Sequence, residues 1–314
     1  MRARRTATAA AAVLVVGALA LAGSAPAGAH TDQLFTVDMP NSGTSIFSTI
    51  DKSTAVVTPV GPAVPGDSPM TAVEIYDEVG YAVGRTDGVS VIATWDHTTG
   101  ALTGAVPLTY PGEFNESSVE GLDTVVNGGL PNGTLLTYAE LDGTLWLASI
   151  NPVTGVLTGV VDLSVPWDDY SEDSIATDPT TGITYLFFDD DAGPVYFIAD
   201  LVLGTVSGPF FLDAIADDLG VDYLLGADFD AAGTLWFIAQ GTLGSTTGPF
   251  SETVGAVGHG DLTGSVPGRQ LTVDPGPMLP ATGMDVTTFI AAGAAAIVLL
   301  LAGGAVLVLR RRTA

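Results

Sequence analysis

The nine residues NPVTGVLTG, from Asn151 to Gly159, contain the pattern that decides the fold of this chain. Asn151 ends a run of strand-forming residues and can start a turn through its side chain. Gly155 follows four residues later and can adopt the positive φ that such a turn requires. A second run of strand-forming residues then begins. This order of residues predicts a β-hairpin closed by an Asx-type turn.

The turn and the strand that follows it recur along the chain at intervals of 45 to 60 residues. The copies begin at positions 54, 99, 154, 203 and 263, and they read TAVVTP, TGALTG, TGVLTG, LGTVSG and TGSVPG. The first copy is degenerate because it lacks the glycine. Repeats of about 50 residues, each with three or four short strands, are typical of a β-propeller.

The body of the chain therefore predicts an all-β fold, a β-propeller of about five degenerate blades over residues 30–274. No 12-residue stretch of it has helical periodicity, and Gly, Pro, Asn and Asp separate its short apolar runs. The first repeat, near Leu34–Gly61, is one strand short, and Gln270–Asp274 could supply that strand and close the ring. Stacked β-sandwich modules are the alternative, but they account less well for the recurring turn.

Between residues 34 and 273 the repeats resemble those of secreted bacterial propellers, whose consensus has the form DPxTGxxTxVG. The segment from Asn151 to Gly159 is the best match, and DPTTG at Asp178–Gly182 has similar letters at an earlier turn of its own repeat. The resemblance implies the propeller fold. It implies no activity, because no copy contains a full diagnostic signature.

Residues 1–29 have the composition of a secretory signal peptide. Arg2, Arg4 and Arg5 precede an apolar run, and small residues at positions 27–29 suit a signal peptidase, which predicts cleavage between Ala29 and His30. A retained membrane anchor is the alternative. The mature chain then begins at His30.

The carboxyl end has three parts. A short linker leads to the pentapeptide LPATG, formed by Leu279, Pro280, Ala281, Thr282 and Gly283, so that linker and motif occupy residues 275–283. Residues 284–309 are apolar, and the uninterrupted run of 24 residues from 286 to 309 exceeds the ~20 that cross a bilayer as a helix. Residues 310–314 contain three arginines, which predict a cytoplasmic tail.

These three parts resemble the cell-wall sorting signal of Gram-positive surface proteins, the LPxTG type. The resemblance covers residues 279–314 and implies that a sortase cleaves the bond between Thr282 and Gly283 and joins Thr282 to peptidoglycan. The chain would be the substrate in this reaction, first as a membrane-spanning precursor and then as an exported, wall-anchored protein. An ordinary protein with a single membrane span is the alternative.

Charge and composition exclude several classes of protein. Residues 30–282 contain 34 acidic residues against Lys52, Arg85 and Arg269, a net charge of −31. Nucleic-acid binding needs clustered Lys and Arg, so we expect no nucleic-acid partner. The chain has no Cys, which excludes disulfides, thiolate metal sites and a Cys nucleophile. Solubility explains this excess of negative charge, and binding of a cation or of a cationic partner is the alternative.

Three acidic segments could bind a ligand. Trp167, Asp168, Asp169 and Tyr170 combine aromatic rings with carboxylates and form the candidate ligand rim, suited to a sugar or a cationic group. Two further acidic groups are weak candidates for a calcium site, although both are explained more simply as turns. These groups are Asp189, Asp190 and Asp191, and Asp228 with Asp230.

No combination of residues predicts catalysis. His97 and His259 are expected in turns, and Trp146 and Trp236, which both follow Gly-Thr-Leu, are expected at equivalent strand positions between blades. We therefore predict a non-enzymatic surface protein without a required cofactor, which binds a glycan or a host protein. An extracellular propeller lyase or glycosidase and a passive wall protein are the alternatives.

Overall fold

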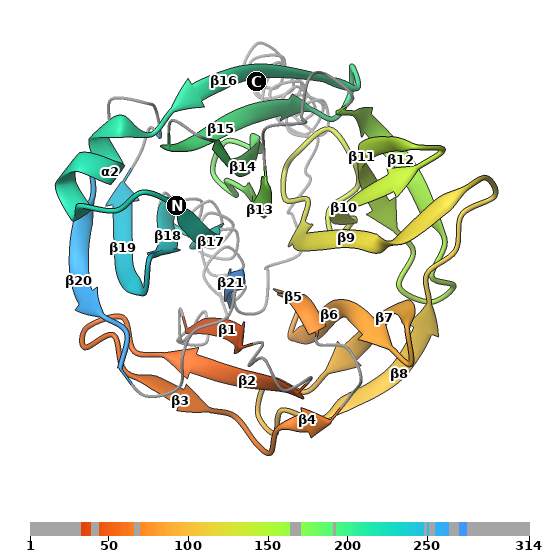
Figure 1. Ribbon diagram of the computed structural model, residues 1–314, viewed down its shortest axis with the longest axis horizontal. Coiled ribbons are helices and arrows are strands. Elements are labelled where there is room, and N and C mark those ends of the chain that lie inside the picture. The colour runs from red at the N-terminus through yellow and green to blue at the C-terminus, as the bar shows by residue number, and fades with distance from the viewer. Residues whose placement is uncertain are drawn as a thin grey trace, which may run out of the picture. The chain divides into compact units, whose positions relative to one another are not determined.

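The computed structural model describes residues 33–38, 44–65, 70–163, 171–190, 193–247, 250, 255–263 and 270–274. The chain divides into two units, Met1–Pro277 and Met278–Ala314, and all described residues belong to the first. In this part of the chain, five antiparallel sheets surround a central axis as the blades of a propeller (Figure 1). The predicted five-bladed fold is confirmed, and the sandwich alternative is wrong.

The first blade joins the two ends of the described chain. From the centre outward it consists of β21 (Gln270–Val273), β1 (Leu34–Asp38), β2 (Thr44–Ile50) and β3 (Val57–Pro59), and β4 (Val64–Pro65) also pairs with β2. The predicted closing strand is thus present, and it is the innermost strand of the blade. A sheet built from both ends of the chain closes the ring, because its strands pair across the join.

The other four blades each use consecutive strands, ordered from the centre outward. The second blade contains β5 (Met70–Tyr76), β6 (Val79–Thr86), β7 (Val89–Trp95) and β8 (Leu102–Pro107), and the third contains β9 (Phe114–Thr124), β10 (Leu135–Leu141), β11 (Thr144–Ile150) and β12 (Leu157–Asp162). The fourth contains β13 (Ser171–Thr177), β14 (Thr184–Asp190), β15 (Gly193–Asp200) and β16 (Thr205–Phe211). A short helix, α2 (Asp213–Leu219), leads to the fifth, which contains β17 (Leu224–Phe229), β18 (Thr234–Ala239), β19 (Thr242–Thr247) and β20 (Val257–Asp261).

Hydrophobic side chains fill the space between each blade and the next. The buried apolar residues form five clusters, and each cluster draws its members from two adjacent blades. Between the first two blades, for example, the rings of Phe47 and Trp95 stack with centroids 4.9 Å apart. Full burial of one such side chain contributes about 1.5–3 kcal/mol, so the blades hold one another in place.

The turn predicted from the repeats closes the third and fourth strands of four blades. We call residues 51–55, 96–100, 151–155 and 200–204 the closing turns. In the second blade, Asp96 Oδ1 accepts hydrogen bonds from the amides of Thr98 (2.8 Å) and Thr99 (3.3 Å), and Gly100 has a φ of 70°. The same pattern recurs after Asp51, Asn151 and Asp200. The Asx-turn prediction is confirmed in these four blades.

The fifth copy, at Thr263, was wrongly placed. Thr263 follows β20, so it lies after the outermost strand of its blade rather than before it. It bridges to the first blade, where the amide of Val57 donates to its carbonyl (2.8 Å), and Thr109 bridges in the same way to Gly155 and Leu157 of the third blade. Thr263 therefore corresponds to Thr109 and not to Thr154. The segment at Thr263 resembles the closing turns in sequence but not in its position in the blade.

Two further expectations need correction. Trp146 lies in β11, the third strand of its blade, whereas Trp236 lies in β18, the second strand, so the two positions are not equivalent. Both still pack in the clusters between blades. His97 lies in a closing turn, as expected, but His259 lies within β20.

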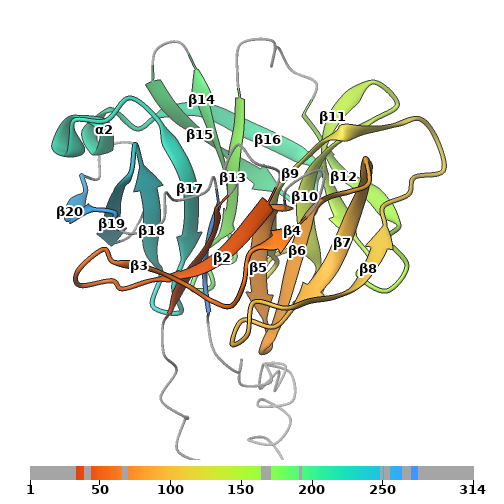
Figure 2. The ribbon, with the colours of Figure 1, turned by 60° about the horizontal axis from the view of Figure 1, so that its bottom comes forward.

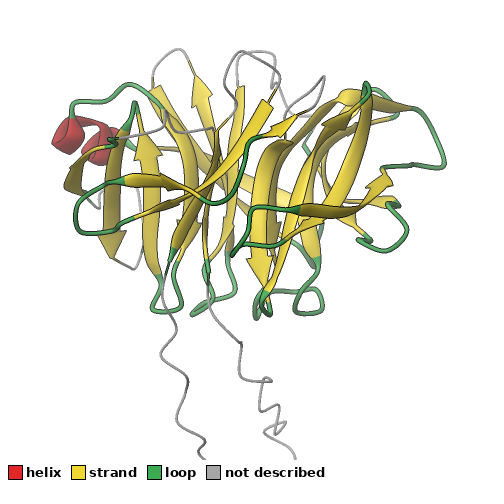
Figure 3. Ribbon diagram, turned by 90° about the horizontal axis from the view of Figure 1, so that it is seen from below, coloured by secondary structure: helices red, strands yellow, loops and turns green. Residues whose placement is uncertain are grey.

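Both ends of the described chain leave from one face of the ring. Leu34, at the start of β1, pairs with Val273, at the end of β21, and also with Ile50, which precedes a closing turn. The closing turns therefore lie on this side, which we call the terminal face (Figures 2 and 3). The hairpins between second and third strands, such as the one around Gly88, lie on the opposite face.

Candidate functional site

The innermost strands bring polar side chains together at the centre of the ring. We call this group the central polar layer, and every inner strand contributes to it. Its members are Glu74 from β5, Asp123 and Thr124 from β9, Thr177 from β13, Asp228 from β17 and Thr272 from β21, and each is at most 6% exposed.

Hydrogen bonds within the layer connect separate blades. Glu74 accepts one from the hydroxyl of Thr124 (2.7 Å) and one from the hydroxyl of Thr272 (2.9 Å). Its carboxyl group therefore joins the second blade to the third and to the first. Asp123 accepts a hydrogen bond from the hydroxyl of Thr177 (2.5 Å), which joins the third blade to the fourth.

Asp228 joins the fifth blade to the closing strand. Its Oδ2 accepts a hydrogen bond from the amide of Val273 (2.6 Å) and a longer one from the hydroxyl of Thr272 (3.3 Å). Its Oδ1 accepts from the amide of Phe229 (2.7 Å). Because β21 contributes both Thr272 and Val273, the ring is closed at its centre by this carboxyl group as well as by strand pairing.

Burial makes these carboxyl groups weak acids. It raises the pKa of Asp228 to about 7, against the hydrogen bonds that lower it. Burial also raises the pKa of Glu74 and of Asp123 well above the usual range, and the nearby charge of Asp228 adds to both shifts. A desolvated carboxyl group favours its neutral form, and neighbouring carboxylates strengthen that preference. At neutral pH the layer therefore retains protons and holds less negative charge than its composition suggests.

The chemistry of the layer is that of a structural element. Acid–base cleavage of a glycoside requires two carboxyl groups that flank a bound substrate. Here the three carboxyl groups are 3% to 6% exposed, and their oxygens accept hydrogen bonds from neighbouring blades. Within the described ranges, no group of three or more His, Asp or Glu side chains is placed to hold a metal ion.

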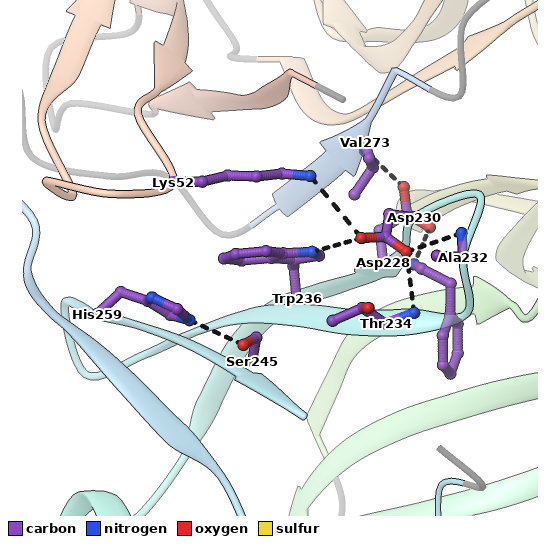
Figure 4. A network of polar contacts seen from close by, with 10 residues as sticks. Lys52, Asp228, Asp230, Ala232, Thr234, Trp236, Ser245, His259 and Val273 are labelled. Atoms are coloured by element: carbon purple, nitrogen blue, oxygen red, sulfur yellow. Dashed lines mark hydrogen bonds and ion pairs between the residues drawn. The ribbon is translucent and has the colours of Figure 1, made fainter. Parts of the chain in front are cut away.

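A second polar group lies at the seam between the fifth blade and the first (Figure 4). Lys52, in the closing turn of the first blade, lies 4.6 Å above the ring of Trp236 and 3.9 Å from Asp230 Oδ2. Trp236 Nε1 donates to the same oxygen (3.0 Å), and the ring of His259 packs against the indole at 4.9 Å. Burial lowers the pKa of His259. The cation–π contact and the ion pair fasten the two blades together at the join.

The predicted acidic sites do not come together. Asp228 belongs to the central polar layer, whereas Asp230 begins the next turn and accepts hydrogen bonds from the amides of Ala232 (3.0 Å) and Thr234 (2.9 Å). Asp189 and Asp190 end β14, where Asp189 Oδ1 accepts from the amide of Leu224 (3.3 Å). Asp189 and Asp190 thus belong to the fourth blade, whereas Asp228 and Asp230 belong to the fifth.

Several predicted sites fall outside the described residues. These are the candidate ligand rim at Trp167, Asp168, Asp169 and Tyr170, the third aspartate of the calcium candidate, Asp191, the signal cleavage site at Ala29 and His30, and the sorting motif from Leu279 to Gly283. The same holds for the apolar segment 284–309. Among the described residues, no helix is both long and apolar enough to cross a membrane.

The central polar layer was not predicted from the sequence as a group. Glu74 and Asp123 were not singled out, and Asp228 was considered only as a metal candidate. A weak signal was present for two of the three, because Glu74 and Asp228 each lie between apolar residues in a strand, as in Val73-Glu74-Ile75. An acid in such a run has to face either water or a polar centre.

Comparisons with known proteins support the fold. No protein-family model matches the chain, and no curated protein matches its sequence. Among solved structures, an endo-1,4-β-xylanase from Bacteroides thetaiotaomicron is similar with a TM-score of 0.50 and 14% identity, over 77% of this chain and 94% of that one.

Two further solved structures have lower TM-scores. A protein of unknown function from Bacteroides caccae has a TM-score of 0.45 and 16% identity, over 76% of this chain and 85% of that one. TolB from Acinetobacter baumannii has 0.44 and 12%, over 77% of this chain and 55% of TolB, so the chain spans about half of TolB's length. At these identities the similarity concerns the fold alone.

Proposed function

We propose that this chain is an exported surface protein that a sortase joins to peptidoglycan through Thr282, and that it displays its propeller to bind a ligand outside the cell wall. The sequence of both ends supports export and anchoring. The propeller fold is consistent with a surface protein. The proposal needs no cofactor and no nucleic-acid partner.

The observation that best supports display is the position of the two ends of the propeller. Val273 and Leu34 are paired neighbours on the terminal face. A chain fixed to the wall shortly after Val273 would turn this face toward the wall. The opposite face, with its hairpins and the connections between blades, would then be turned toward the surroundings, where a ligand can reach it.

The candidate ligand rim lies outside the described residues, and the strands on either side of it support including it in the proposed binding surface. The strands that flank residues 164–170 are β12 and β13, and β13 begins at Ser171, which pairs with Asp189 near the hairpin that joins β14 to β15. That hairpin belongs to the opposite face. We therefore retain the ligand rim as part of the proposed binding surface for a glycan or a host protein.

The central polar layer favours a binding role over an enzymatic one. Carboxyl groups that cleave glycosides or abstract protons have to reach their substrate. The carboxyl groups at the centre of this ring are nearly inaccessible and are occupied by hydrogen bonds between blades. Their arrangement supports a scaffold whose centre is held by bonds between blades and whose loops are available for binding.

Substitution of Thr282 tests the anchoring. In Thr282→Ala, sortase should no longer form the acyl intermediate, so we expect the protein to move from the wall fraction to the membrane fraction or the medium. Ala281→Ser is the matched control, because the third position of the motif tolerates many residues, and it should remain in the wall. Cell fractionation and mass spectrometry of wall digests measure both. Wall attachment of Thr282→Ala equal to that of the parent would refute the proposal.

A further inference from the structure

The closing turns of the third and fourth blades present exposed apolar side chains on the terminal face. Val153 is 82% exposed, Val202 is 71% exposed and Leu203 is 73% exposed. Among the described residues, no other large hydrophobic side chain is as exposed as these three. We call Val153, Val202 and Leu203 the apolar patch.

The turns themselves do not require apolar side chains at these positions. Val153 and Val202 are the third residues of their turns, and the amide of each donates to the side chain that begins the turn (both 3.0 Å). The corresponding residues of the first two blades, Ser53 and Thr98, form the same bond and add one from the hydroxyl (2.7 and 2.6 Å). A valine lacks this second bond and exposes apolar surface to water, so the stability of the turn does not explain it.

The part of the terminal face around the apolar patch has little charge. The third and fourth blades contribute four connections to this face, two between first and second strands and two closing turns. These connections are residues 125–134, 151–155, 178–183 and 200–204. Their only charged residues are Asp178, which is buried, and Asp200. The corresponding connections of the first two blades contain Asp51, Lys52, Asp77, Glu78 and Asp96.

The closing turn of the fourth blade lies against the third blade. A Cβ added at Gly129, between β9 and β10, would collide with the side chain of Val202. A Cβ added at Gly204 would lie 3.1 Å from the carbonyl oxygen of Val160 in β12. The apolar patch therefore belongs to two blades that contact each other, and a single flat surface could cover both turns.

We propose that the apolar patch contacts the outer surface of the cell membrane before sortase cleaves the chain. The inference rests on the proposed function, because the apolar run 286–309 has to span that membrane. Asp274, the last described residue, precedes Val286 by 12 residues, which extend over at most about 40 Å. The terminal face is thus confined near the bilayer, and a tether this short makes even a weak affinity sufficient for contact.

The chemistry of the patch favours a lipid surface over a protein partner. The net charge of −31 on residues 30–282 repels anionic headgroups at long range, so the least charged part of the face approaches a membrane most easily. A few aliphatic side chains suit the shallow interface of a bilayer. A stable protein partner needs about 800 Å² on each side, which is more than three turn side chains provide. The contact would orient the propeller with its opposite face outward.

The contact is tested on the precursor, residues 30–314, reconstituted in phosphatidylcholine vesicles. The chain has no Cys, so a nitroxide label can be attached to one introduced Cys. Thr154→Cys places the label beside the apolar patch, and Thr99→Cys places it at the same position of the closing turn in the second blade. Electron paramagnetic resonance compares collisions of the label with oxygen, which concentrates in lipid, and with a water-soluble nickel complex. We expect the ratio of oxygen to nickel collisions to be about threefold higher at position 154 than at position 99.

A variant without the patch separates the contact from the tether. Val153→Thr, Val202→Thr and Leu203→Thr together introduce the residue type found at positions 98 and 99, so the protein should melt as before while the ratio at position 154 falls to that at 99. Equal ratios at the two positions in the parent would overturn the proposal. Dipolar broadening between labels at 154 without a raised ratio would overturn it in favour of a second copy of the chain.

Failure of this contact is distinguishable from failure of the proposed function. A precursor that does not float with the vesicles would overturn the predicted span and the contact together. A precursor that floats but shows equal ratios overturns the contact alone. Wall attachment of Thr282→Ala tests the anchoring independently of both.

Discussion

Asp96 and Asp228 accept the same kinds of hydrogen bond in two different regions of the ring. Asp96 lies in an exposed closing turn and accepts from the hydroxyl of Thr98 (2.6 Å) and from two amides. Asp228 lies in the central polar layer and accepts from the hydroxyl of Thr272 and from two amides. Hydrogen bonds lower the pKa of Asp96 to about 2, whereas burial raises the pKa of Asp228 to about 7. Desolvation therefore outweighs hydrogen bonding at the centre.

The two regions also differ in what their carboxyl groups connect. In a closing turn the acceptor and its donors are two or three residues apart, so the bonds stabilise one hairpin. In the central polar layer the partners lie 45 residues apart for Asp228 and Val273, and 198 residues apart for Glu74 and Thr272. Bonds at the centre thus contribute to the ring as a whole, and their loss should affect global stability.

The largest expected effect is that of Asp228→Ala. The substitution leaves the buried amides of Val273 and Phe229 without their acceptor, which should lower the free energy of unfolding by about 3–5 kcal/mol. Asp228→Asn retains an oxygen acceptor and should cost much less. Asp96→Ala is the control in a closing turn and should change stability least, because water replaces the lost acceptor. Urea unfolding followed by tryptophan fluorescence measures all three, and equal losses for Asp228→Ala and Asp96→Ala would remove the distinction between the regions.

The second prediction concerns pH. A carboxyl group whose pKa is higher in the folded chain stabilises the fold below its unfolded pKa, and this contribution is lost as the pH rises through the folded pKa. With a shift from 3.8 to about 7, Asp228 alone should cost about 2–3 kcal/mol of stability between pH 5 and pH 8. Glu74 and Asp123 act in the same direction.

The closing turns should show the opposite dependence. The pKa of Asp51 and that of Asp96 fall from 3.8 to about 2, so their contribution is complete above pH ~4 and is lost as the pH falls toward ~2. The parent should therefore be most stable in mildly acid solution. Melting temperatures from pH 2 to pH 9 test this, and Asp228→Asn should flatten only the alkaline side. A parent that becomes steadily more stable up to pH 8 would show that the central carboxyl groups ionise freely.

The smallest effect concerns two glycines with similar backbone conformation. Gly88, in a hairpin of the opposite face, has a φ of 80°, and a Cβ added there would meet nothing within 4 Å. Gly100, in a closing turn, has a φ of 70°, but its Cβ would lie 1.9 Å from the carbonyl oxygen of Val60 in the first blade. Gly88→Ala should cost about 1 kcal/mol for the positive φ alone, and Gly100→Ala about 2 kcal/mol or more because a neighbouring blade has to move. Thermal unfolding compares the two, and equal losses would mean that the closing turns do not contact adjacent blades tightly.

The fold was largely predictable because its repeating signal is local. A turn former and a glycine four residues later fix a closing turn through bonds within five residues, and this pattern located three of the five blades. The degenerate copy, in which Ala55 takes the place of the glycine with a φ of 54°, located a fourth. The closing strand was also predicted, since the first repeat is one strand short. Thr263 was misplaced because a Thr-Gly pair occurs both in closing turns and after a bridging strand. Only the backbone pairing of Thr263 with Ala55 and Val57 shows that this Thr-Gly pair follows a bridging strand and does not belong to a closing turn.

The central polar layer was hard to predict for a physical reason. Its bonds join residues from different blades, and nothing in the local sequence near Glu74 specifies Thr124 or Thr272 as its partners. With 35 acidic residues in the chain, the immediate neighbours do not separate the acids at the centre from those on the surface. The exposed Asp162 and Asp200 also lie between apolar residues, and the buried Asp123 is followed by a threonine.

The position of β21 has a mechanical consequence. This strand is the innermost of its blade, and the chain continues from its end toward the segment that we propose is fixed to the wall. A force on a captured ligand would then pull β21 along its own axis, so that its bonds to β1 and to Asp228 are loaded together in shear rather than opened one after another. A tether placed on an outer strand such as β20 would instead peel that strand from the blade. The tether is thus attached to the innermost strand, which we expect to withstand a larger pulling force than an outer strand would.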